Sequence, residues 1–169
     1  VALAARGAGE ESRSAGKAKA EGGGTEIREQ LNGQVRGIAV NPGDTLVARN
    51  LRFLRSEEDA AQLDPAVYHP GEMLWARFEI TGYKLEEKNH YSVSYGLVVL
   101  TESGQQVFAQ PDAAADSKAS FYPQRYVPGA LSLSLDQGVP AGAYTLMVTM
   151  RDDVGHQTAE SRGSFRVER

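Results

Sequence analysis

The chain has 169 residues, of which 41% are hydrophobic and 24% are charged, a composition that excludes a wholly disordered protein. Its formal net charge of −4 has the wrong sign for a protein that binds nucleic acid by neutralising phosphates. The absence of cysteine excludes disulfides and thiolate metal sites, and no apolar run approaches the about 20 residues of a membrane-spanning helix. We therefore expect a globular domain with no membrane span and no nucleic-acid partner.

The N-terminal segment has the composition of a disordered arm. Residues 1–24 are rich in Ala and Gly, and after Leu3 they contain no large apolar side chain to bury. We predict a disordered arm over residues 1–34 and a single folded domain over residues 35–169. Ala2-Leu3-Ala4 has the small-x-small form read by signal peptidase, so the start of the chain is either a signal-peptide remnant or an arbitrary boundary. The first alternative favours an exported protein, periplasmic or extracellular.

From residue 45 onward, short stretches of alternating apolar and polar residues are separated by turn-forming Gly, Pro, Asn and Asp, which is typical of β-strands. The predicted strands cover residues 45–55, 73–80, 91–100, 106–109, 131–136, 144–151 and 164–168. The first would also serve as an amphipathic helix, but β-branched Val47 and the poor helix former Asn50 favour a strand. The spacing predicts an all-β fold, namely a single immunoglobulin-like two-sheet sandwich of about seven strands after the disordered N-terminal arm.

Two segments resemble a known class of domains. Val67-Tyr68-His69-Pro70-Gly71-Glu72, which leads into an alternating strand, resembles the Tyr-x-Pro-Gly-Glu strand entry of macroglobulin domains. Pro140-Ala141-Gly142-Ala143-Tyr144 and the strands that follow resemble the end of macroglobulin and immunoglobulin-like sandwiches in bacterial surface and periplasmic proteins. The Gly-x-Tyr of the second segment is also similar to a tyrosine corner, which implies a hydrogen bond from the Tyr144 hydroxyl to backbone near Asp136.

The resemblance covers residues 65–80 and 136–168 and implies a scaffold-type domain. Some full macroglobulins trap proteases through a Cys-Gly-Glu-Gln thioester, which a chain without cysteine cannot form.

We find no motif for catalysis or metal binding. His69, His90 and His156 are widely separated without metal-ligand spacing, and no Gly-x-Ser-x-Gly elbow occurs. Two carboxylate pairs, Asp152-Asp153 and Asp112 with Asp116, could supply oxygen ligands to calcium, but neither follows the spacing of a calcium loop. Asp is also an ordinary turn residue. We therefore predict a protein that is not an enzyme, with no catalytic residue, no metal and no cofactor.

The candidate binding residues are aromatic side chains and neighbouring arginines. Trp75 is out of phase with the predicted inward residues of its strand, so it is expected on the outer face together with Arg77. Residues 121–126 bring Tyr122, Arg125 and Tyr126 together around a proline. Tyr, Trp and Arg are the usual hot-spot residues of protein interfaces, and aromatic rings also stack on sugars.

These residues lead to two functional hypotheses. The first is a non-catalytic, exported binding or structural module that contacts a protein partner or other domains, with Trp75 covered by protein. The alternative is a carbohydrate-binding accessory domain, in which an exposed Trp75 lies beside Tyr122 or Tyr126 on a flat face. If all these aromatic side chains are instead buried, they fill the core and bind nothing.

Overall fold

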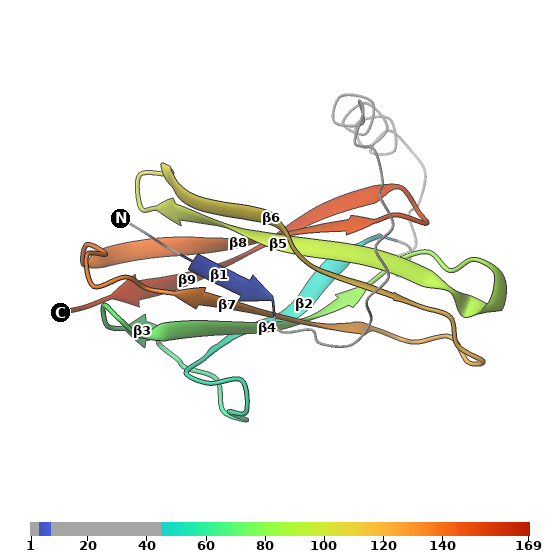
Figure 1. Cartoon of the computed structure of the whole chain (residues 1–169), viewed down its shortest axis with the longest axis horizontal. Helices are drawn as coiled ribbons and strands as arrows, with labels where there is room; N and C mark the ends of the chain where they lie inside the picture. Colours follow the sequence, from blue (N-terminus) through green and yellow to red (C-terminus); the bar gives the residue numbers. More distant parts are fainter. Residues whose placement is uncertain (1–3, 8–44) are drawn as a thin grey trace.

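The computed structural model describes the backbone of residues 4–7 and the whole of residues 45–169. These residues form two β-sheets that pack face to face (Figure 1). The strands are β1 (Ala4–Gly7), β2 (Val47–Leu54), β3 (Val67–Tyr68), β4 (Met73–Thr81), β5 (Tyr91–Thr101), β6 (Gln106–Lys118), β7 (Val127–Ser134), β8 (Gly142–Asp152) and β9 (Gln157–Val167), with one 3-10 turn, η1 (Glu87–Asn89). One sheet has the order β1-β7-β4-β2 and the other β3-β9-β8-β5-β6. The predicted all-β, two-sheet sandwich is confirmed.

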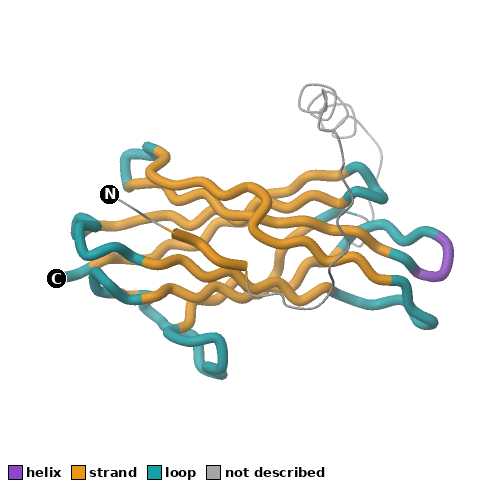
Figure 2. Tube along the Cα trace, viewed as in Figure 1, coloured by secondary structure: helices purple, strands orange, loops and turns teal. Residues whose placement is uncertain are grey.

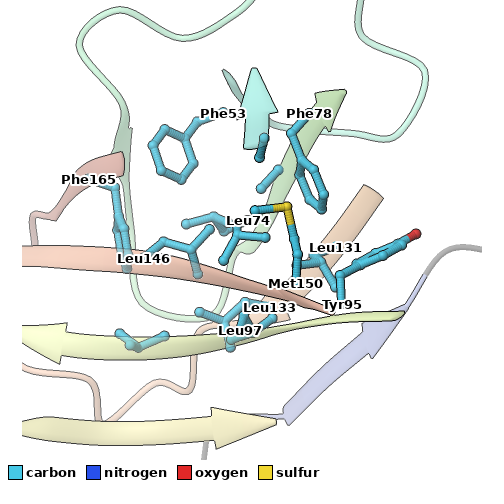
Figure 3. Packing of buried hydrophobic residues seen from close by; sticks show 14 of the residues in the cluster. Phe53, Leu74, Phe78, Tyr95, Leu97, Leu131, Leu133, Leu146, Met150 and Phe165 are labelled. Atoms are coloured by element: carbon cyan, nitrogen blue, oxygen red, sulfur yellow. The ribbon is translucent and has the colours of Figure 1, made fainter. Parts of the chain in front are cut away.

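The core lies between the two sheets and follows from the alternation of the sequence. In β4 the predicted inward residues are the buried ones, because successive side chains of a strand point to opposite faces. Figure 3 shows Leu74 and Leu131 of one sheet facing Leu97 and Leu146 of the other. The strand preferred over a helix for residues 45–55 is β2, and its end residue Leu54 is fully buried.

β6 differs most from its prediction. The alternating pattern covers only residues 106–109, whereas the strand runs from Gln106 to Lys118 and includes Pro111. Opposite Gly96 the register between β5 and β6 shifts, and a Cβ at Gly96 would lie only 2.1 Å from the Pro111 carbonyl oxygen. Because the bulge interrupts the alternation, the second half of β6 has no sequence signature of a strand.

The expected tyrosine corner has a different acceptor. The Tyr144 hydroxyl donates a hydrogen bond of 2.8 Å to the carbonyl oxygen of Pro140, not to backbone near Asp136. The bond closes the turn that leads into β8, which is the structural role that the resemblance implied.

Two short strands extend the predicted set. β3 pairs in parallel with the end of β9, and β1 pairs antiparallel with β7. β1 falls inside the arm predicted for residues 1–34, so four residues of that segment are paired with the sheet. The remainder of the arm and the predicted start of the domain at residue 35 lie outside the described residues, and these boundaries stay predictions. In the described part of the chain, no helix has the length and apolar character to cross a membrane.

Candidate functional site

The predicted binding residues occupy two separate parts of the sandwich. Trp75 and Arg77 are half-buried on β4, pointing away from the inter-sheet core. Tyr122, Arg125 and Tyr126 are exposed in the connection between β6 and β7, at the end of the sandwich where the connections β4–β5 and β8–β9 also lie (Figure 2). The structure therefore groups the second set and leaves the first apart from it.

The register of β4 against β7 measures this separation. Trp75 lies opposite Ser132, whereas Ile80 lies opposite Val127, the residue that follows Tyr126. At the usual rise of a strand, the step from Trp75 to Ile80 is about 17 Å. Trp75 and Tyr126 consequently do not form one continuous aromatic surface.

Trp75 has buried neighbours on the outer face of its sheet. In the register it faces Leu54 of β2 on one side and Ser132 of β7 on the other, so these three side chains share one face. Leu54 is fully buried although it is not part of the inter-sheet core, and Ser132 is buried as well. The indole ring therefore lies beside two buried residues on this outer face, which is a structural environment.

The connection between β6 and β7, residues 119–126, exposes three aromatic side chains and an arginine, and we call it the aromatic loop. Phe121 is 86% exposed and Tyr122 75% exposed, and Tyr126 and Arg125 are exposed beside them. The rings of Phe121 and Tyr122 are 4.8 Å apart between centroids, at an interplanar angle of 82°. Phe121 belongs to the aromatic run 121–126 that the sequence indicates, although it is not one of the residues predicted to bind.

The aromatic loop is fixed to the neighbouring connection by backbone contacts near its tip. The Ser120 amide donates to the carbonyl oxygen of Lys88 at 3.1 Å. The side-chain amide of Asn89 donates to the carbonyl oxygens of Ser120 and Phe121, at 3.2 and 3.0 Å. Lys88 and Asn89 both have positive φ angles, so η1 turns back toward the aromatic loop. The two exposed rings therefore stand on an anchored backbone.

Two tyrosines anchor the second half of the same loop. The Tyr83 hydroxyl donates to the Gln124 carbonyl oxygen at 2.7 Å, and its ring packs 5.3 Å from that of Tyr91. The Tyr91 hydroxyl in turn donates to Asp116 at 3.0 Å. Burial, and then the Asp116 carboxylate, raise the pKa of both phenols. Both hydroxyls therefore keep their protons at neutral pH and remain hydrogen-bond donors.

Glu86, His90 and Ser117 form a hydrogen-bonded chain near the same end. His90 Nδ1 contacts Glu86 Oε1 at 2.5 Å, and its Nε2 contacts Ser117 Oγ at 2.9 Å. This order of groups is that of an acyl-transfer triad, which also requires a recess with donors that hold the acyl oxygen. Ser117 instead lies on the exposed surface of β6, so we assign the three side chains to anchoring the β4–β5 connection on β6.

Asp152, one of the carboxylates considered for calcium, is fully buried at the end of β8. Its Oδ1 accepts the amides of Val154 and Gly155 at 3.1 and 3.0 Å. Its Oδ2 accepts the Lys84 amide at 2.8 Å and the side-chain amide of Gln157 at 3.4 Å. Because N–H donors occupy both oxygens, Asp152 serves as a structural acceptor and not as a cation ligand.

Gln157 extends this network to the start of β2. Its Oε1 accepts the Leu46 amide at 3.1 Å, and its Nε2 also donates to the Gly82 carbonyl oxygen at 3.3 Å. Asp152 and Gln157 thus connect the β8–β9 turn, the β4–β5 connection and the entry to β2. The end of the sandwich that carries the aromatic loop is held by buried polar bonds.

No protein-family model and no curated protein matches the sequence. Among solved structures, the chain is similar to a family 123 glycoside hydrolase from Clostridium perfringens, with a TM-score of 0.45 and 11% identity over 73% of this chain. It is similar to the alkylpurine DNA glycosylase AlkC of Pseudomonas fluorescens, with a TM-score of 0.48 and 10% identity over 75% of this chain. A PapD-like domain of human CEP192 matches with a TM-score of 0.37 and 14% identity, covering 79% of this chain and 90% of that one. The match spans only 27% of the hydrolase and 31% of the glycosylase. These likenesses do not identify a family for the chain.

Proposed function

We propose that the chain is a non-catalytic protein-binding module whose docking surface is the aromatic loop. The observation that carries this proposal is the pair Phe121 and Tyr122, which are 86% and 75% exposed on a backbone anchored at several points. An aromatic side chain that a partner covers typically buries about 150–250 Å² of surface. Two adjacent exposed rings therefore offer a large apolar area that a partner protein can bury.

The anchoring of the loop favours tight binding. A partner that docks on a mobile loop must first order it, which costs free energy, whereas an anchored loop is largely pre-organised. The contacts from Asn89 and Tyr83 hold the backbone of the aromatic loop on both sides of its tip. Little ordering cost then opposes the burial of Phe121 and Tyr122.

Arg125 indicates the chemistry of the partner. Its side chain is exposed, and it makes no ion pair with any residue between 45 and 169. A guanidinium next to aromatic rings is the usual composition of an interface hot spot, where it forms paired bonds to a carboxylate. We propose a partner surface that combines an apolar recess for the rings with an acidic group for Arg125.

The geometry favours a protein over a sugar. A glycan platform needs rings in one plane, but Phe121 and Tyr122 lie at 82° to each other, and half-buried Trp75 lies on β4, apart from the aromatic loop. The scaffold-type domain implied by the macroglobulin resemblance fits this proposal. Export of the chain remains part of the proposal, since it comes from the sequence alone.

The experiment that tests the proposal places a photo-crosslinking amino acid at Tyr122 in cells that make the natural protein. We expect a discrete protein adduct from position 122. The matched control is position 107, where Val107 is an exposed apolar residue near the start of β6, at the end of the sandwich opposite to the aromatic loop. The proposal would be contradicted if position 122 gave no protein adduct, or if positions 122 and 107 gave the same set of adducts.

A glycan array with the purified chain tests the alternative. We expect no glycan whose binding is lost in Trp75→Ala together with Tyr126→Ala. A glycan that binds the wild-type chain and not this variant would support the carbohydrate-binding function instead.

A further inference from the structure

The four lateral edges of the two sheets are protected to different degrees. Exposed edges pair readily with other strands, and proteins block them with bulges, prolines or a covering strand. β1 covers β7, the register of β2 against β4 shifts between Arg49 and Arg52, and β6 carries both Pro111 and a bulge. In the described part of the chain, the β9 edge has neither a bulge nor a proline, and its covering strand β3 reaches only its last two residues.

β9 is long and regular. It pairs with β8 from Gln157 to Val167 without a register shift, and it contains no proline. On its other side, β3 pairs only with Arg166 and Val167. Among the described residues, residues 157–165 of β9 have no strand partner on that side.

The direction of the free backbone groups follows from one hydrogen bond. The Arg166 amide donates outward to the Ala66 carbonyl oxygen at 2.9 Å. Because the direction alternates along a strand, the amides and carbonyls of Thr158, Glu160, Arg162 and Ser164 also point outward. These residues can exchange main-chain hydrogen bonds with an added strand.

Space is present beside the last part of this edge. An open groove of about 570 Å³ lies between residues 163–166 of β9, residues 51–53 of β2 and the connection 62–66. Phe53 and Leu51 cover the inner face of β9 at Gly163, where a Cβ would meet them at 2.8 to 3.0 Å. The free surface is therefore the edge of β9 and not its face.

We propose that β9 is an interface that pairs antiparallel with β9 of a second copy of this chain. A two-fold axis at Ser161 places Glu160 opposite the partner's Arg162, and Arg162 opposite the partner's Glu160. Thr158 then lies opposite the partner's Ser164. In this register the outward backbone groups exchange about eight hydrogen bonds, which lengthens the five-stranded sheet across both copies.

The charges of Glu160 and Arg162 favour this register and favour a second copy of the chain as the partner. A shift by two residues places Glu160 opposite Glu160, or Arg162 opposite Arg162, and like charges directly opposite destabilise a strand pair. A shift by one residue turns the backbone groups of the two strands out of phase. In the single chain, Arg162 and Glu160 are exposed and 3.8 Å apart at their charged atoms. A second copy therefore adds two complementary pairs to a strand that already carries both signs.

Sedimentation equilibrium of the full chain over a wide concentration range tests the interface. We expect a reversible dimer that Glu160→Arg or Arg162→Glu each weaken by about tenfold or more. Each variant places like charges opposite one another in its own dimer, while both substitutions lie at exposed positions and should leave the melting temperature of the monomer unchanged. An equimolar mixture of the two variants should dimerise again, because each then meets the opposite charge.

Three results would overturn the proposal. They are a wild-type chain that remains monomeric at all concentrations, a dimer insensitive to both substitutions, and a mixture that does not recover association. A monomeric chain that instead binds an extended peptide along β9 would show that the edge receives a different partner and would also overturn it.

Discussion

The hydroxyl of Tyr68 donates a hydrogen bond of 2.8 Å to the carbonyl oxygen of Leu54, and both residues are fully buried. Tyr68 belongs to β3 of one sheet and Leu54 to β2 of the other, so the bond connects the two layers. The Tyr68 ring also meets the Phe165 ring edge-on at 6.2 Å. Leu54 is in addition the cross-strand neighbour of Trp75, which links this bond to the outer face of the sandwich.

Removing the Tyr68 hydroxyl should destabilise the folded chain. In Tyr68→Phe a buried carbonyl oxygen loses its donor, and we expect the free energy of unfolding to fall by about 1 to 3 kcal/mol. Tyr144→Phe should cost about 1 kcal/mol, because the Pro140 carbonyl belongs to an exposed residue that water can reach. Tyr126→Phe, at an exposed position, is the control with no expected change. Urea denaturation measures all three, and equal midpoints for Tyr68→Phe and Tyr126→Phe would contradict this ranking.

Stability should decrease in alkaline solution. Burial raises the pKa of Tyr68 and of Tyr91 above the ordinary value of 10.0. Above pH 10 the unfolded chain releases these phenolic protons while the folded chain retains them, so the stabilisation is complete below pH 10 and is lost as the pH rises toward the raised values. We expect a steep loss of the urea midpoint above pH 10 that becomes shallower in Tyr91→Phe. An unchanged slope in this variant would show that Tyr91 does not contribute.

Asp152→Asn should destabilise the loop end. An amide nitrogen cannot accept N–H groups, so the Lys84 amide or the turn amides lose their buried acceptor, at a cost of about 2 to 4 kcal/mol. Asp153→Asn is the matched control, because Asp153 is exposed and should cost about 0.5 kcal/mol or less. Hydrogen exchange of the Lys84, Val154 and Gly155 amides should accelerate only in Asp152→Asn. Equal exchange in both variants would count against the buried network.

Trp75 should report a half-buried environment. Because it is the single tryptophan, its emission is unambiguous, and we expect partial quenching by acrylamide. Trp75→Ala should cost about 1 to 3 kcal/mol, less than the about 3 to 5 for a fully buried aromatic residue, because the side chain is only half-buried. Trp75→Phe should restore most of this loss. Complete quenching, together with an unchanged free energy of unfolding in Trp75→Ala, would instead indicate that Trp75 is exposed and available for binding.

The sequence predicts those strands that have one buried face and one solvent-exposed face. Leu74, Phe78 and Ile80 alternate with polar residues because they face the core, and the alternation is visible without a structure. The second half of β6 has no such signal, since Pro111 and its bulge break the period of two. β1 and β3 are too short for a pattern, and their pairing depends on the edges that the rest of the fold provides.

The candidate site also has features that the sequence predicts and features that depend on the fold. The composition of residues 121–126 indicates Tyr122, Arg125 and Tyr126 as candidates, and the structure shows that all three are exposed. Their distance from Trp75 could not be predicted, because it depends on the register of β4 against β7. The buried role of Asp152 was also beyond the sequence, since Asp before a glycine has the same pattern in an exposed turn.

The most direct test of the central claim is the affinity of the partner identified from position 122, measured by calorimetry for the chain and for Phe121→Ala with Tyr122→Ala. We expect binding to weaken by about a hundredfold with an unchanged melting temperature, because both rings are exposed in the free chain. Val107→Ala, an exposed apolar control away from the aromatic loop, should bind as the wild-type chain does. Unchanged affinity in the double variant would contradict the assignment of the aromatic loop as the docking surface.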